Sequence, residues 1–113
     1  MYNDAKTLKE EWERIKAMNL KIRESIQLQQ NPVKREKLLK LQDKIENTDN
    51  QYYSRLIAEA ERIESIGNST MSIDEKLRKI DFITATIHAI NEKYDTDSKA
   101  LHNDLMEIQK EKD

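Results

Sequence analysis

Side chains able to act as acids, bases or metal ligands are few and scattered in this sequence. The two histidines, His88 and His102, stand fourteen residues apart. That spacing is too long for them to share a metal ion on one helix, and neither follows a glutamate by three residues as in helical di-iron sites. The absence of cysteine excludes a disulfide framework and a thiolate metal site. We therefore expect no enzyme activity and no bound metal.

Known ligand-binding loops are also missing from the sequence. Gly67 is the single glycine, so the clustered glycines that cradle phosphate groups do not occur. Asp95 and Asp97 resemble the start of a calcium-binding loop, but Ala100 replaces the required sixth-position glycine and Met106 replaces the twelfth-position glutamate. We expect no cofactor.

Composition narrows the classes of partner. Twenty basic and twenty-two acidic residues give a net charge of -2, which lacks the basic excess that nucleic-acid backbones require. No apolar run approaches the ~18 residues that span a bilayer, and the charged beginning lacks the apolar core of a signal peptide. We expect a cytoplasmic protein that neither binds nucleic acid nor inserts into a membrane.

The elements that must position any binding surface are marked by apolar residues at every seventh position. This spacing is the seam of a long helix packed against other helices. It is clearest in the last third of the sequence, at Ile73, Ile80, Ile87, Tyr94, Leu101 and Ile108. Shorter runs with the same spacing occur earlier, so the whole chain is expected to be helical.

Turn and cap signals divide the chain into three helices. Asn31 followed by Pro32 is typical of a helix start. Gly67 can end a helix in the left-handed conformation, and Ser72 with Glu75 forms a capping box. The predicted helices cover residues about 4–29, 32–66 and 73–111. Short turns make neighbours antiparallel, so the prediction is one all-α domain, residues 1–113, an up-down-up bundle of three long helices.

The third helix is predicted to run unbroken through the polar segment 95–98, because the seven-residue spacing continues across it. At 1.5 Å per residue it is about 60 Å long, so its tail is expected to extend beyond the first helix.

Asn19 falls on the seam of the first helix, where a buried asparagine fixes register. Thr48 and Asp49 interrupt the seam of the second helix.

Apolar residues beside the seams favour a monomer over an intermolecular coiled coil. They widen the buried stripe beyond what a two-stranded zipper needs. These residues are Met18, Leu39, Tyr53, Ile57, Phe82, Ile83 and Ile90. The coiled-coil alternative stays open at this point. Trp12 and Tyr52 lie at core positions, whereas Tyr53 suits either the core or a binding surface.

A run of lysines on the second helix has two interpretations. The lysines recur at steps of three, three and four residues and share one helix face; they are Lys34, Lys37, Lys40 and Lys44. They form either a solvated face with pairs such as Glu36 to Lys40, or part of a binding surface.

The order of apolar and turn features resembles the BAG domain, a three-helix co-chaperone module. The similarity runs from Pro32 through LLKLQDKIENTDNQYYSRL, RIESI and KLRKIDFITATIHAI to YDT. The resemblance implies binding to the ATPase domain of a heat-shock chaperone. The family's contact positions fall at Asn50, Glu64, Lys79 and His88, where Asn50 and His88 depart from the family's acid and glutamine.

A second similarity is to the Habc domain of syntaxins, through LLKLQDKIENTDNQYYSRL and INEKYDTDSKALHNDL. It implies a SNARE helix as partner. A small helical protein of a bacterium or phage, with a regulatory or structural role, is the third alternative. The expected function is non-enzymatic protein binding on the outer side of the second and third helices. If the BAG resemblance holds, the residues expected to contact the partner are Lys37, Lys44, Glu64, Lys79 and His88.

Overall fold

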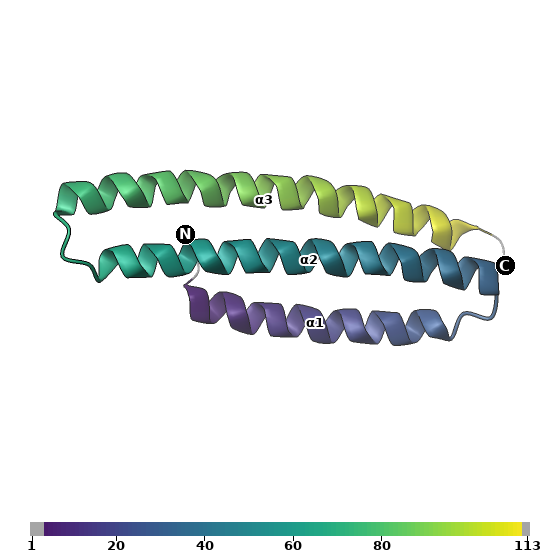
Figure 1. Cartoon of the computed structure of the whole chain (residues 1–113). Helices are drawn as coiled ribbons and strands as arrows, with labels where there is room; N and C mark the ends of the chain where they lie inside the picture. The colour runs from purple at the N-terminus through teal and green to yellow at the C-terminus, as the bar shows by residue number, and fades with distance from the viewer. Residues whose placement is uncertain (1–3, 112–113) are drawn as a thin grey trace.

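The computed structural model describes residues 4–111. Over this range the chain consists of three α-helices and contains no strand: α1 (Ala5–Gln27), α2 (Pro32–Gly67) and α3 (Ile73–Lys110). Consecutive helices run antiparallel (Figure 1). The predicted all-α, up-down-up architecture is confirmed.

Each helix begins at a polar side chain that accepts hydrogen bonds from the first free backbone N–H groups. Asp4 caps α1, Asn31 caps α2 with Pro32 in the first turn, and Ser72 caps α3 by accepting from the N–H of Glu75 at 3.3 Å. The starts predicted at Asn31 and Ser72 are confirmed.

The end of α2 differs from the prediction. Gly67 is the last helical residue, and no described residue has a positive φ angle. Asn68 ends the helix with φ −91° and donates its N–H to the Glu64 carbonyl, and the next N–H, that of Ser69, donates to the Ile66 carbonyl. The left-handed conformation predicted for Gly67 is therefore wrong, because an ordinary tight last turn already satisfies these carbonyls.

Helix α3 is continuous through residues 95–98, as predicted. Two ion pairs at i,i+4 spacing support this polar stretch, one from Lys93 to Asp97 at 2.6 Å and one from Lys99 to Asp95 at 2.9 Å. Such pairs offset the poor helix propensity of aspartate, serine and threonine.

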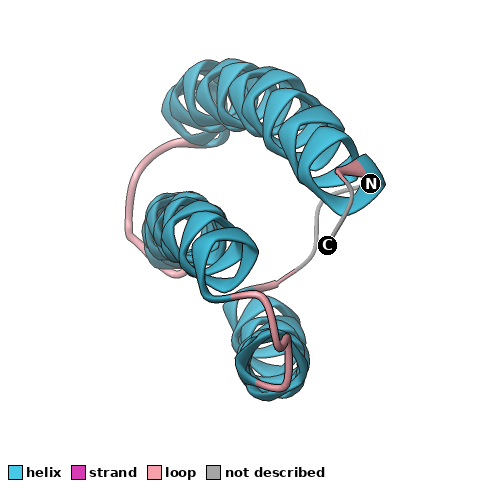
Figure 2. Cartoon of the chain, turned by 90° about the vertical axis from the view of Figure 1, so that its right-hand side faces the viewer, coloured by secondary structure: helices cyan, strands magenta, loops and turns pink. Residues whose placement is uncertain are grey.

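Helix α2 lies between the other two helices (Figure 2). Both α1 and α3 pack on α2, but within residues 4–111 no Cα atom of α1 lies within 8 Å of one in α3. The molecule is elongated, 63 × 22 × 18 Å. The bundle is therefore organised around α2, which presents separate sides to α1 and α3.

The main apolar core lies in the half of α2 that leads to the α2–α3 turn. It combines side chains from all three helices, namely Ala5, Leu8, Tyr53, Leu56, Ile57, Ala60, Ile63, Ile83 and Ile87. Of the residues expected to widen the buried stripe, Tyr53, Ile57, Ile83 and Ile90 are buried, but Met18 and Phe82 are exposed. The stripe is therefore narrower than predicted.

Helix α1 covers only part of the α2–α3 hairpin. Its first residue, Ala5, donates its backbone N–H to the Glu64 carboxylate at 3.1 Å, so the hairpin end extends past α1 (Figure 1). At the other end Lys34 donates to the carbonyl groups of Gln109 and Glu111. The prediction that the tail of α3 extends beyond α1 is wrong. The part of α3 that extends past α1 is its start.

Candidate protein-binding surface

An open groove runs between α2 and α3 on the part of the hairpin nearest the turn. Four of its lining residues carry charge and three are apolar. The residues are Arg62, Ile66, Glu75, Arg78, Lys79, Phe82 and Ile83. We call this the Phe82 groove.

Phe82 is 76% exposed. Ile83 and Ile87 face the core, and Phe82 precedes Ile83 by one residue, which turns it about 100° around the helix. A rigid helix therefore holds a large apolar side chain in solvent. Removing such a side chain from water contributes about 1.5–3 kcal/mol, and aromatic side chains often anchor protein interfaces.

Two unpaired cations lie one helical turn before Phe82 on α3. Arg78 and Lys79 are exposed and make no ion pair with any residue of the described range. Arg62, on the opposite wall, pairs with Glu59 at 3.3 Å. Unpaired exposed cations remain available to an acidic ligand, whereas a pre-existing pair must first be broken.

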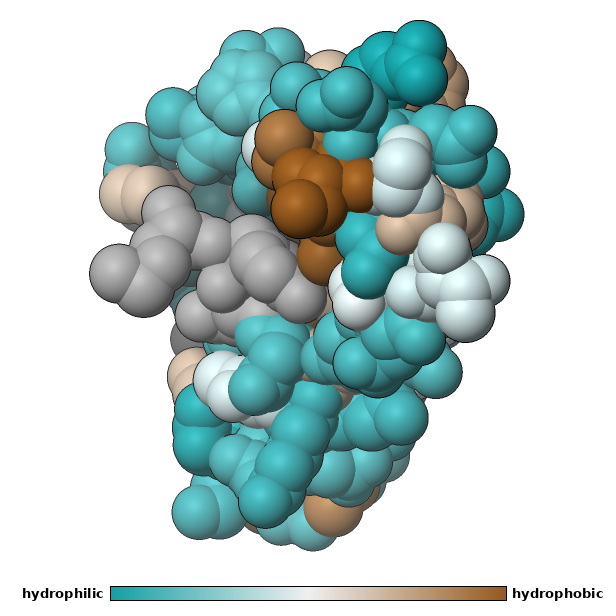
Figure 3. Space-filling view, turned by 90° about the vertical axis from the view of Figure 1, so that its left-hand side faces the viewer, coloured by the Kyte–Doolittle hydropathy of each residue, from teal (hydrophilic) through white to brown (hydrophobic). Residues whose placement is uncertain are grey.

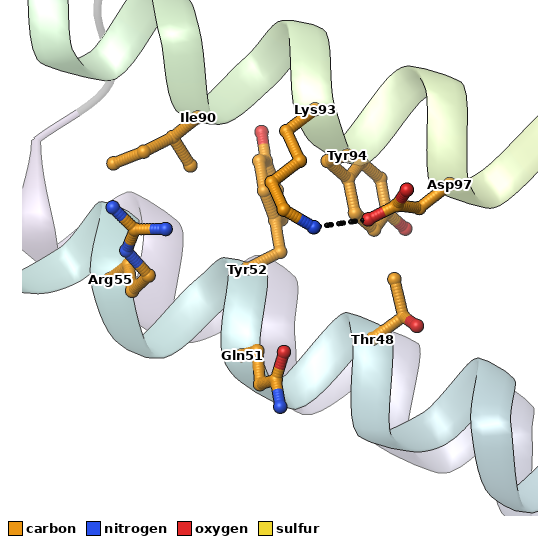
Figure 4. Close-up of a pocket in the computed structure, with 8 residues that line it drawn as sticks. All are labelled: Thr48, Gln51, Tyr52, Arg55, Ile90, Lys93, Tyr94 and Asp97. Atoms are coloured by element: carbon orange, nitrogen blue, oxygen red, sulfur yellow. Dashed lines mark hydrogen bonds and ion pairs between the residues drawn. The ribbon is translucent and has the colours of Figure 1, made fainter.

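A second groove lies between α2 and α3 (Figure 4), on the side of the hairpin that the heptad spacing from Arg55 to Arg62 gives it. Arg55 lies one heptad before Arg62 on α2, about 10 Å away along the axis, and its side chain rises toward Ile90 of α3. Lys93 pairs with Asp97 along the α3 side of this groove. We call the two grooves together the outer α2–α3 face.

A separate, small apolar patch lies among hydrophilic side chains at the turn end of the molecule (Figure 3). Ile73 and Leu77 are 75% and 55% exposed, at the end of the hairpin that α1 does not reach. Leu77 and Phe82 are five residues apart, about 140° around α3. The patch and the Phe82 groove therefore lie on different sides of α3.

Of the residues predicted to bind a partner, Lys79 lines the Phe82 groove. Glu64 instead accepts the backbone N–H of Ala5 at 3.1 Å and so anchors the start of α1. A carboxylate near a helix N-terminus satisfies a free N–H and interacts favourably with the helix dipole. The observed contact of Glu64 is therefore structural.

The remaining predicted residues lie elsewhere. Lys37 pairs with the Glu111 carboxylate at 3.1 Å near the end of α3. His88 pairs with Glu92 at 3.0 Å along α3, and Lys44 is exposed on α2. None of these three lines either groove of the outer α2–α3 face.

The lysine run of α2 is not one solvated face. Lys34 is 8% exposed and binds carbonyl groups at the end of α3, whereas Lys40 pairs with Glu36 at 3.3 Å as expected. Sequence spacing placed the lysines on one helix side, but it could not show that α3 returns to cover the first of them.

A buried polar layer joins the three helices near their middle. Asp49 is 7% exposed; one carboxylate oxygen accepts from Asn19 at 2.9 Å and the other from the Tyr94 hydroxyl at 2.6 Å. Gln42 donates to Asn19 at 3.3 Å. Burial, and then the bond to Asp49, raise the pKa of Tyr94. The buried position predicted for Asn19 is confirmed.

Stacked aromatic rings flank this layer. Tyr52 stacks on Tyr94 with 4.0 Å between ring centroids and meets Tyr53 edge to face at 4.9 Å. Trp12 stacks on Tyr53 and donates its indole N–H to Asn50 at 3.2 Å. Tyr53 is buried, while Trp12 and Tyr52 are half-buried. These rings thus pack between helices, and Asn50 is engaged by Trp12.

Within residues 4–111, no three His, Asp or Glu side chains lie together in a way that could hold a metal ion. The same range contains no helix that is both long and apolar enough to cross a bilayer. Comparisons with protein-family models, curated proteins and solved structures find no match to this chain.

Proposed function

We propose that this chain is a non-enzymatic, cytoplasmic protein-interaction module that binds its partner through the outer α2–α3 face. The observation that carries the proposal is the exposed Phe82 one helical turn after the unpaired cations Arg78 and Lys79. An aromatic anchor with a charged rim is the usual composition of a binding hot spot.

The packing of α2 and α3 supports a preformed surface. Ile83 and Ile87 hold the neighbouring turns of α3 in the core, so binding at Phe82 would not have to order the helix. A preformed surface loses less conformational entropy when it binds than a flexible one.

A photo-crosslinking side chain tests this surface. Benzoylphenylalanine would replace Phe82 in the full chain, and a control would carry it at His102, which is exposed on a distant face of the same helix. Illumination in a lysate of the source cells is expected to give an adduct at position 82 and not at 102. Equal adducts at both positions, or none at 82, would reject the surface.

A stoichiometric, tightly bound metal or nucleotide in the purified protein would reject the non-enzymatic assignment.

The BAG resemblance gives one specific form of the proposal, in which the partner is the ATPase domain of a heat-shock chaperone. Lys79 in the Phe82 groove supports this form, whereas Glu64 is bonded to α1. Titration with such an ATPase domain is expected to show binding at tens of micromolar or tighter in low salt, weakened by Lys79→Glu. No binding would reject the co-chaperone form. Recovery of a SNARE helix or a bacterial protein would favour the Habc or regulator alternative.

A further inference from the structure

We infer that the segment bound by the outer α2–α3 face is an acidic amphipathic helix of another protein. The inference rests on the proposed function and specifies the chemistry of its partner. It follows from the charge, the apolar floor and the length of this face.

The charge of the face is opposite to that of the chain. The two grooves are lined by five basic and two acidic side chains, although the whole chain carries a net charge of -2. The basic residues are Arg55, Arg62, Arg78, Lys79 and Lys93. Lys93 is paired with Asp97, but Arg55, Arg78 and Lys79 have no ion-pair partner in the described range. A ligand with several carboxylates complements this arrangement.

The first groove has an apolar floor, and one isoleucine continues it into the second groove. Ile66 and Ile83 line the first groove and Ile90 lines the second, with Phe82 at the rim. Ile83 and Ile90 are one heptad apart, about 10 Å along α3. An amphipathic helix presents apolar residues at i, i+3, i+4 and i+7 over the same distance, and its flanking positions would place carboxylates beside the cations.

The experiment begins with the adduct formed at position 82. Mass spectrometry would identify the crosslinked segment, which is expected to carry a net negative charge and an apolar helical repeat. A synthetic peptide of that sequence would then be titrated against the full chain, against Arg78→Glu/Lys79→Glu, and against Arg14→Glu/Lys21→Glu. The last variant makes the same change in net charge at exposed residues outside the face.

The Arg78→Glu/Lys79→Glu variant is expected to weaken binding about tenfold or more, with the control variant unchanged and helicity retained in both. Raising the salt concentration should weaken wild-type binding, and a peptide with lysine in place of its acids should bind the Arg78→Glu/Lys79→Glu variant better than wild type. A neutral or basic captured segment, equal effects of the two variants, or capture of a second copy of this chain would overturn the inference. If an adduct forms at position 82 but charge reversal does not change peptide binding, the inference fails and the proposed function stands. If no adduct forms at position 82, the proposed function and the inference both fail.

Discussion

The Tyr94 hydroxyl donates a 2.6 Å hydrogen bond to Asp49, and this bond ties the middle of α3 to α2. The other oxygen of the same carboxylate accepts from Asn19 of α1. One buried side chain therefore links all three helices, although α1 and α3 have no described Cα atoms within 8 Å of each other. Because a displaced register would leave a buried carboxylate unpaired, this layer favours a single alignment of the helices.

Replacing Tyr94 with phenylalanine is expected to lower the free energy of unfolding by about 1–3 kcal/mol, because one oxygen of Asp49 would lose its buried donor. Tyr52→Phe is the matched control, since its hydroxyl donates to the exposed Asn91. Urea unfolding measures both. A Tyr52→Phe effect as large as that of Tyr94→Phe would contradict the role of the layer.

The centre of the core has no room for a larger side chain at Ala60, which is 0% exposed. Ala60→Leu is expected to destabilise the chain by about 1–3 kcal/mol through overpacking. Ala58→Leu, on the exposed side of the same helix, should change stability by less than about 0.5 kcal/mol. Thermal or urea unfolding would compare them, and a tolerated Ala60→Leu would show that the helices are packed differently.

Alkaline pH should destabilise the fold. Burial, and then hydrogen bonds to Glu11 and Asp49, raise the pKa values of Tyr53 and Tyr94 above the ordinary 10.0. Above pH 10 the unfolded chain therefore releases protons that the folded chain retains, so this contribution to stability is complete below pH 10 and is lost as pH rises. Unfolding measured from pH 8 to 11 should show the decline, less steeply for Tyr94→Phe. A flat profile would contradict it.

The chain is expected to be a monomer, because its core cluster draws on all three helices of one molecule. Light scattering should give the mass of one chain, 13.4 kDa. A two-chain mass that persists at low micromolar concentration would instead indicate that the exposed patch around Ile73 and Leu77 is a dimer interface.

Helix type, order and starts could be predicted because they depend on local chemistry. Asn31 and Ser72 cap the N–H groups two or three residues ahead, and the seven-residue spacing needs no knowledge of the partner helix. The role of Asp49 could not be predicted, because its donors come from Asn19, 30 residues before it, and Tyr94, 45 residues after it. The sequence showed Asp49 only as an interruption of the seam.

The binding surface was less predictable for the same reason. Lys79 could be placed on the outer side of α3, but the contacts of Glu64 and Lys37 depend on where other helices end. Phe82 was expected in the buried stripe, because an apolar residue next to a seam is ambiguous from sequence alone. The length of α1 and its position against α2 decide which apolar residues stay exposed.

The most direct test of the central claim is the affinity of the captured partner for Phe82→Ala, measured by titration calorimetry with Leu77→Ala as control. Both substitutions remove an exposed apolar side chain of α3, but only Phe82 lines the outer α2–α3 face. We predict a loss of about tenfold or more for Phe82→Ala, about 1.4 kcal/mol of binding free energy, and no change for Leu77→Ala. Unchanged affinity for Phe82→Ala would contradict the account.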